Sequence, residues 1–445
     1  MRRTRVNRGV VRARSTDLIR HLRTPLYRNA YALVANSAVS AMLGLLYWVL
    51  VARLYSAEDV GRNSAVIASI IFLSGIAQLN LRPVLSRFIP VAGTSTGRFV
   101  AIAYFVSADA ALVVGAVFVL GIQLWAHDSV YAMIRSTPFL AFSFIGMNVL
   151  WCIFGLQDGV LIGLRRSVAV LVENSLFGIA KIVFAVVFTL QAATRGPGIV
   201  VSWIIPMVIA IVVVNAAVFR KFVPVHVTAH PETSDLIEPR RIARFVAGDY
   251  LGSLFALAYA SLLPVIIISQ VGATKSAHFY IVWIISTSLQ LVPLQMVTSL
   301  VVETAAEPLA FQRQARHLVV QIARILVPVG VILLIGASSI LQIFGRGYAE
   351  DGAGLLRLLV LSLIPDTVIV LFFGFARVRA RVRGIVAVQA ALAASILGLS
   401  GLLLPGLGLT GVGIAYLASQ TGLALFLLVT ALRPVLRSST VIARR

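Results

Sequence analysis

Long apolar segments recur along the whole chain, and they restrict its fold more than any other feature. About twelve runs of roughly 20 residues or more stand at 29–54, 63–89, 98–124, 137–164, 168–192, 198–220, 245–270, 277–303, 318–343, 353–375, 384–404 and 408–432. Each run is long enough to cross about 30 Å of hydrocarbon as a helix. Barrel strands would be shorter and would alternate apolar with polar residues. The sequence therefore predicts an all-α polytopic membrane protein.

The composition agrees with lipid as the main solvent of this chain. Hydrophobic residues make up 59% of the 445 positions and charged residues 12%, which is more apolar than a water-soluble core requires. The single cysteine, Cys152, can form no disulfide within the chain, and no cluster of metal-ligand residues is found in the sequence. The basic N-terminal segment lacks an apolar core followed by a cleavage site, so the first span is predicted to act as its own signal.

The distribution of basic residues predicts the orientation. With the N-terminus inside, 30 of the 38 Lys and Arg residues fall on the inner segments and seven on the outer loops. Positive charge concentrates on cytoplasmic loops, so both termini are predicted to be cytoplasmic, in the inner membrane. The net charge of +22 is then explained by topology and by contact with anionic lipid, and not by binding to nucleic acid.

One polar segment divides the chain into two halves. The stretch from 219 to 244 is too short for a soluble domain and carries three prolines, with six runs before it and six after. We expect a basic cytoplasmic N-tail at 1–28, an N-lobe at 29–220, a cytoplasmic linker at 221–244, a C-lobe at 245–432 and a basic cytoplasmic C-tail at 433–445. Six is an even number, so the halves can be parallel repeats, and both are predicted to open with a similar helical hairpin.

Charged residues inside the predicted spans are the first candidates for function. Lys181 and Asp109 lie near the middle of their spans, where a charge costs at least about 2.5–3.5 kcal/mol. By depth, Asp109 is the best candidate partner for Lys181. Asp158, Glu173 and Asp249 lie nearer the cytoplasmic side and, with Asp109, are candidate coupling carboxylates. Asp366 follows a proline and is interpreted as a helix-start residue.

Basic and amide side chains complete the predicted binding site. Arg82 and Arg87 lie late in the second span and Arg53 at the outer end of the first, and Asn36, Asn80 and Asn148 supply amides. Several aromatic residues, including Tyr47, Trp48, Trp151 and Tyr259, could stack on sugars or belong to interfacial belts. A cavity lined by such groups suits an anionic, hydroxyl-rich substrate.

Several motifs carry a resemblance to a known family. "ARLYSAEDVG" at 52–61, "RFIP" at 87–90, "LQDGVLIGLRR" at 156–166 and "IFGRGYAEDGAGLLRLL" at 343–359 resemble segments of polysaccharide biosynthesis flippases. These are the Wzx-like branch of the multidrug/oligosaccharidyl-lipid/polysaccharide (MOP) exporter superfamily. The resemblance implies two six-helix lobes around a central cavity that opens alternately inward and outward, as in MATE-like transporters. It also implies translocation of undecaprenyl-pyrophosphate-linked oligosaccharides, with basic cavity residues meeting the pyrophosphate.

The expected function is therefore that of a flippase and not of an enzyme. The sequence contains no phosphate-binding loop, so ATP is not the expected fuel, and coupling would come from H⁺, Na⁺ or the membrane potential. The expected partners are the lipid-linked glycan, membrane lipids and a polysaccharide polymerase or glycosyltransferases. The alternatives are a drug/cation antiporter of the same superfamily, a membrane glycosyltransferase or ligase, and a non-transporting member of an assembly complex.

Overall fold

The computed structural model describes residues 25–125, 134, 137–190, 197–229, 239–303, 308–379 and 382–432. Every regular element within these ranges is helical. The long helices of the first half are α2 (Pro25–Leu54), α3 (Ala57–Ala77), α5 (Thr96–Trp125), α7 (Pro138–Gly163), α8 (Ser167–Thr189) and α9 (Gly198–Ala217), with the short helices α4 (Leu81–Phe88) and α10 (Val223–Ala229). Those of the second half are α11 (Pro239–Val271), α12 (Ala273–Glu303), α13 (Pro308–Gln342), α14 (Arg346–Leu361), α15 (Leu363–Val378) and α16 (Val382–Leu427). The predicted all-α fold is confirmed.

The number of spans agrees with about twelve once two irregular helices are considered. Within the described ranges, ten helices are long and apolar enough to cross a membrane, and α14 with α15 makes an eleventh across a 41° bend. The 46-residue α16 is too long for one crossing. It is two helices that meet at Gly408, whose φ of 58° and ψ of −147° are not helical. Glycine adopts such a backbone without steric penalty, so it divides this element into the last two spans.

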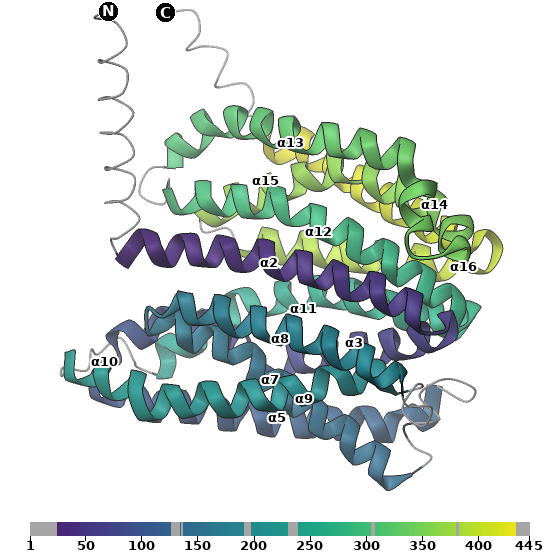
Figure 1. Ribbon diagram of the computed structural model, residues 1–445. Helices are drawn as coiled ribbons and strands as arrows, with labels where there is room; N and C mark the ends of the chain where they lie inside the picture. The colour runs from purple at the N-terminus through teal and green to yellow at the C-terminus, as the bar shows by residue number, and fades with distance from the viewer. Residues whose placement is uncertain are drawn as a thin grey trace, which may run out of the picture.

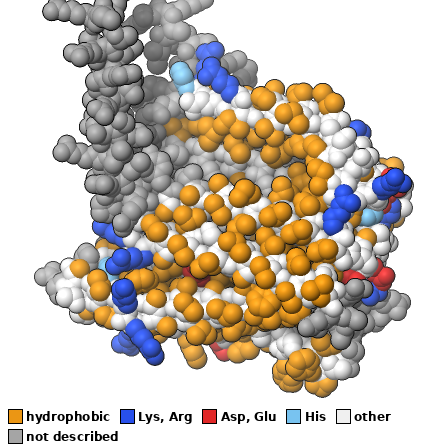
Figure 2. Space-filling view, in the orientation of Figure 1, with side chains coloured by type: hydrophobic (Ala, Val, Ile, Leu, Met, Phe, Trp, Pro, Cys, Tyr) orange, Lys and Arg blue, Asp and Glu red, His pale blue; other side chains and the backbone are white. Residues whose placement is uncertain are grey.

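The helices pack as two groups, with α2 at their boundary (Figure 1). The helices α5, α7, α8 and α9 form the lower group in this view, and α13 to α16 form the upper group. Hydrophobic side chains cover the middle of the surface, and Lys and Arg gather toward its two ends (Figure 2). This pattern is that of a bundle whose helices run across a bilayer. Residues 1–24 and 433–445 of the predicted tails and residues 230–238 of the predicted linker lie outside the described residues.

Both halves open with the predicted helical hairpin. The helices α2 and α3 are joined at Tyr55 and Ser56, and the Ser56 hydroxyl accepts a hydrogen bond from the Asp59 amide at 3.1 Å. This bond satisfies one of the free amides at the start of α3. The helices α11 and α12 are joined by Gly272 alone, at a φ of +85°. We call the end of the bundle that holds these two turns the far end, and the end where α2 begins the terminal end.

The two halves are closed against each other at the far end. Arg53 of α2 donates hydrogen bonds to the carbonyl oxygens of Ile343, at 2.5 Å, and Gln342, at 2.9 Å. These two carbonyls belong to the C-terminal end of α13, where backbone oxygens have no helical partner. A Cβ atom added to Gly61 of α3 would lie only 1.8 Å from the Ala273 carbonyl oxygen of α12. The far end therefore holds the halves together by a charged hydrogen-bonding side chain and by direct backbone approach.

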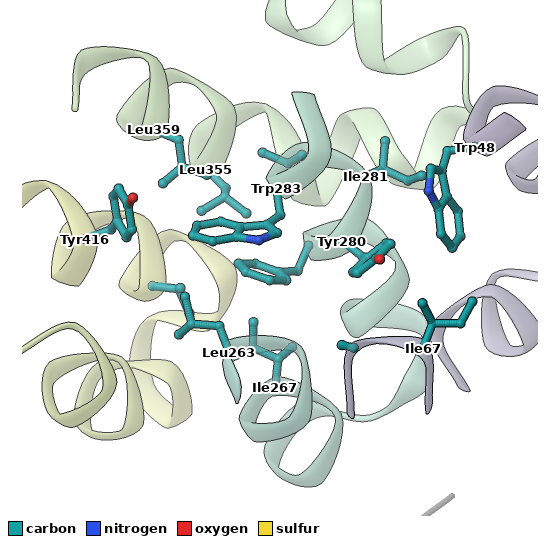
Figure 3. Close-up of a cluster of buried hydrophobic side chains, with 14 of the residues drawn as sticks. Trp48, Ile67, Leu263, Ile267, Tyr280, Ile281, Trp283, Leu355, Leu359 and Tyr416 are labelled. Carbon is teal, nitrogen blue, oxygen red and sulfur yellow. The ribbon is translucent and has the colours of Figure 1, made fainter. Parts of the chain in front are cut away.

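Below this closure the boundary between the halves is filled with hydrophobic side chains. The Trp48 ring of α2 meets the Tyr280 ring of α12 edge to face, with centroids 4.7 Å apart. Figure 3 shows the same cluster continuing from Trp48 and Ile67 through Tyr280 and Trp283 toward Tyr416. Tyr47 and Trp48 are 0% and 3% exposed, so they are core residues and do not form an interfacial belt.

The close approach at Gly61 gives a prediction about stability. Gly61→Ala places a methyl group against the Ala273 carbonyl, and such overpacking costs about 1–3 kcal/mol, so the apparent Tm of the purified protein should fall by several degrees. Gly44→Ala in α2 is the matched control because no atom lies within 4 Å of its added Cβ. Thermal unfolding in detergent checks this. Equal Tm values for the two variants would contradict the contact between α3 and α12.

Candidate functional site

A break in the second span marks the candidate site. The helix α3 ends at Ala77 and α4 begins at Leu81. Between them, Leu79 and Asn80 have left-handed backbones with φ of 48° and 54°, a conformation that is uncommon for residues other than glycine. Non-helical backbone inside a membrane is tolerated only where protein buries it or where it lines a cavity.

A pocket of about 270 Å³ lies at this break, between the two halves, and both polar and apolar side chains line it. We call it the interlobe pocket. Its walls from the first half are Gly75, Gln78, Asn80, Arg82 and Pro83, and those from the second half are Tyr250, Ser253, Leu254 and Leu257 of α11. The Tyr250 hydroxyl donates a hydrogen bond of 2.7 Å to the Ile76 carbonyl oxygen and so connects the two sides. The pocket is on the terminal side of the apolar boundary, opposite the closed far end.

Arg82 is the cation of the interlobe pocket. Its Nη2 atom lies 2.9 Å from Oδ2 of Asp158 on α7, and the side chains are 49% and 14% exposed. The other carboxylate oxygen of Asp158 accepts a 3.2 Å hydrogen bond from Asn174 of α8. Asp158 thus holds the Arg82 guanidinium in place. The Arg82 side chain remains about half exposed, and it lines the pocket. The predicted site residues Arg82 and Asn80 are brought together here.

Glu173 lies deeper in the first half. It is 5% exposed, and neither carboxylate oxygen has a hydrogen-bond partner among the described residues. Its electrostatic neighbours are Asp158 and Tyr104 of α5, whose hydroxyl is also buried and unpaired. An ionised carboxylate without a partner is expensive in this position. Glu173 is consequently suited to carry a proton or to meet a cation.

Lys181 does not line the interlobe pocket. It is 8% exposed, and its Nζ atom lies 4.2 Å from the ring centroid of Trp203, 4.7 Å from that of Tyr47 and 5.5 Å from that of Phe177. These rings come from α9, α2 and α8, and we call them the aromatic cage. Cation–π contacts contribute about 0.5–2 kcal/mol each. Within the described part of the chain, the ammonium makes no hydrogen bond and no ion pair.

The predicted pairing of Lys181 with Asp109 is wrong, because α5 turns Asp109 away from the bundle. Ser107 and Ala111 face inward, and their carbonyl oxygens accept bonds from the Cys152 thiol, at 3.6 Å, and from the Asn148 amide, at 2.8 Å. A residue two positions from Ser107 is rotated by about 200° on a helix. Asp109 is accordingly exposed on the outer face of α5.

The other predicted residues are dispersed over the first half. Asn148 joins α7 to α5 through the bond to Ala111, and its Oδ1 is buried and unpaired. Asn36 is half-buried on α2 and accepts a bond of 3.5 Å from Ser40. Arg87 is exposed on α4, with its guanidinium 5.9 Å from the Phe88 ring. Arg53 belongs to the far-end closure and not to the interlobe pocket.

Two carboxylates of the second half, Asp249 and Asp366, were also considered in the sequence. Asp249 belongs to α11, and its side chain lies outside the described ones. Asp366, interpreted above as a helix-start residue, does stand in the first turn of α15, yet it also meets a polar cluster. Its Oδ1 accepts a long hydrogen bond of 3.5 Å from Gln420 of α16, and its Oδ2 is buried and unpaired. Only the tertiary packing of α15 on α16 shows this second environment.

Comparison with known proteins finds solved structures of the same fold, but it finds no family by sequence. No family model matches the chain, and no curated protein matches it. Among solved structures, the lipid II flippase MurJ in an inward closed conformation has a TM-score of 0.65 at 12% identity, covering 92% of this chain and 90% of that one. A MOP superfamily transporter from Pyrococcus furiosus, described as having a binding pocket of reverse polarity, has a TM-score of 0.62 at 15% identity, covering 92% and 95%.

A MATE transporter in complex with MaD3S is similar to the same extent. Its TM-score is 0.61 at 16% identity, and the match covers 91% of this chain and 95% of that one. All three structures are of transporters or flippases, and each match covers nearly the whole of both chains. The chain therefore has the fold of the MOP superfamily transporters.

Proposed function

We propose that the protein is a flippase that moves a lipid-linked, anionic glycan across the inner membrane, as an undecaprenyl-pyrophosphate-linked oligosaccharide, for polysaccharide biosynthesis. The observation that carries this proposal is the interlobe pocket, in which Arg82 lies beside amides and hydroxyl groups at a broken helix. The fold is compatible with the proposal, because one protein of this fold is a lipid II flippase.

The chemistry of the pocket favours a phosphorylated, hydroxyl-rich headgroup. The guanidinium of arginine is always charged and binds phosphate with two parallel donors. Gln78, Asn80, Tyr250 and Ser253 add amide and hydroxyl groups that suit phosphate oxygens and sugar hydroxyls. A volume of about 270 Å³ has room for a headgroup and not for an oligosaccharide, so the glycan requires the space gained when the halves separate.

The predicted orientation supplies the direction. If both termini are cytoplasmic, the interlobe pocket lies on the cytoplasmic side and the Arg53 closure on the outer side. A substrate built in the cytoplasm would then meet Arg82 first. Lys181 is proposed as a second cationic contact for the substrate, because no described carboxylate pairs with it. Its aromatic cage resembles surfaces on which sugar faces stack.

Coupling to an ion gradient is proposed at the unpaired carboxylates. Glu173 and Asp366 both have buried carboxylate oxygens without a hydrogen-bond partner among the described residues, and Asp158 forms an ion pair with Arg82. Either H⁺ or Na⁺ could serve as the coupling ion at these carboxylates.

The unpaired carboxylates also favour a second candidate function, a MATE-like drug/cation antiporter. The fold is compatible with it, because a multidrug resistance MATE transporter shares this fold. Uptake of a cationic dye into inverted vesicles, driven by H⁺ or Na⁺, separates the candidates: this activity would favour the antiporter.

A cellular assay tests the flippase through Arg82. Cells lacking the protein should accumulate lipid-linked oligosaccharide on the cytoplasmic leaflet, and wild type should relieve the accumulation. Arg82→Gln should reduce relief by about tenfold or more, the effect of losing a charged hydrogen bond of about 1.5–3 kcal/mol. Arg98→Gln is the matched control, because Arg98 is exposed near the terminal end of α5 and does not line the pocket. No accumulation despite an intact upstream pathway would reject the flippase.

The same assay tests Lys181 separately. Lys181→Met keeps most of the side-chain volume and removes a buried charge, so abundance and Tm should stay near those of wild type. Relief of accumulation should nevertheless be lost, because the methionine cannot attract an anion. Full relief at matched abundance would remove Lys181 from the binding site and leave the function standing.

Anion binding to the purified protein tests whether Asp158 competes with the ligand for Arg82. Asp158→Asn should raise the affinity for inorganic pyrophosphate several-fold, because the guanidinium loses its internal carboxylate partner. Arg82→Gln should abolish this binding in either background. Isothermal titration calorimetry measures both effects. An unchanged affinity in Asp158→Asn would mean that Arg82 is not shared.

A further inference from the structure

Asp109 occupies an unusual place in the membrane. It lies on α5, within the candidate span Gly93–Gly121, sixteen residues from one limit and twelve from the other. Its side chain is exposed on the outer face of the bundle. No hydrogen bond or ion pair joins it to any described residue. A short carboxylate near the middle of the bilayer therefore faces lipid.

Three other charged groups in the spans of the first half are accommodated by the protein. Asp158 pairs with Arg82, Lys181 is enclosed by aromatic rings, and Glu173 is buried. Ionisable residues in transmembrane segments nearly always face the bundle interior or a water-filled cavity. Asp109 departs from this rule, and a carboxylate cannot reach the interface as a long Arg or Lys side chain can. The surface around it is consequently incomplete in the isolated chain.

The surroundings of Asp109 form a continuous stripe that a helix could cover. Exposed hydrophobic residues stand on the same side of α5 over about four turns. They are Ile102, Phe105, Leu112, Val113 and Val117, at 49%, 75%, 48%, 55% and 64% exposure. In Figure 1, α5 lies along the lower edge of the bundle, away from α2 and the boundary between the halves. The only basic residue of α5 is Arg98, near its start.

We infer that this stripe is the docking surface for a transmembrane helix of another membrane protein, and that this helix carries a Lys or Arg side chain at the depth of Asp109. An opposite charge stabilises a carboxylate in hydrocarbon, and no lipid headgroup reaches that depth. The inference concerns a face remote from the interlobe pocket and does not depend on the proposed function.

A second copy of this chain fits the surface less well. A two-fold contact through α5 would bring Asp109 against Asp109, two like charges. Arg324 of α13 is exposed in another span, but α13 lies at the opposite edge of the bundle (Figure 1). A head-to-tail contact between Asp109 and Arg324 would not close and would generate open chains of molecules. The charge on the stripe thus favours a different protein.

Photo-crosslinking of the full-length protein in its native membrane tests the inference. A photoreactive amino acid replaces Phe105 or Leu112, on either side of Asp109, and the control replaces Leu402 of α16, which is 76% exposed on another helix. We expect one protein adduct from both stripe positions and none from Leu402. Asp109→Leu should reduce the adduct by about tenfold, as expected for loss of a desolvated charge pair, and Asp109→Glu should retain it.

The identity of the adduct then decides the matter. Peptide mapping should place the crosslink on a transmembrane helix with a central Lys or Arg, and exchanging the two charges between the proteins should restore the adduct that Asp109→Lys alone abolishes. Asp109→Leu makes α5 more apolar, so its insertion should be preserved, and a monodisperse elution profile verifies this. Adducts with lipid only, an adduct with another copy of this chain, or a protein adduct that persists in Asp109→Leu would each overturn the inference.

Discussion

Hydrocarbon offers no hydrogen-bond partners, and the arrangement of this molecule follows from that constraint. Backbone amides and carbonyls in the hydrocarbon must be paired within the protein, which explains why the described spans are helical. The breaks within the described helices are then informative. Gly408 separates the last two spans, and α14 and α15 meet at a bend. The break at Leu79 and Asn80 differs from these, because a pocket with a basic side chain lies there between the halves.

The same constraint sorts the charged side chains by what surrounds them. Arg82 combines an internal partner, Asp158, with an exposed half, which is the arrangement expected of a group that exchanges one anion for another. Among the described residues, the Lys181 ammonium contacts aromatic rings and pairs with no carboxylate. Its charge is tolerated because ring faces replace part of the lost hydration. The first half therefore holds two cations of different character, one accessible and one enclosed.

Much of this fold could be predicted from the sequence, because the length and continuity of the apolar runs reflect the thickness of the membrane. The hairpins whose turns lie at residues 55–56 and 272 were predicted from the similarity of the two halves. Arg82 was predicted late in the second span, which is where the helix breaks. What could not be predicted was the direction in which a side chain points. Depth alone suggested that Asp109 meets Lys181, whereas helix phase separates them. The sequence predicted only the helix-start position of Asp366. Its contact with Gln420 could not be predicted, because that contact depends on how two distant helices pack.

The proposed flipping requires movement between two states, and this movement would break the contacts that close the far end. Arg53 would leave the carbonyl oxygens of α13, and Trp48 would separate from Tyr280. A ligand can drive such a change only if it binds one state more tightly than the other. In the proposed cycle, an anion that takes Arg82 from Asp158 would leave an uncompensated carboxylate next to Glu173, and a state that relieves this charge would bind the anion more tightly. Proton or cation uptake by these two acids would then be linked to the presence of the substrate, and the halves would respond to both.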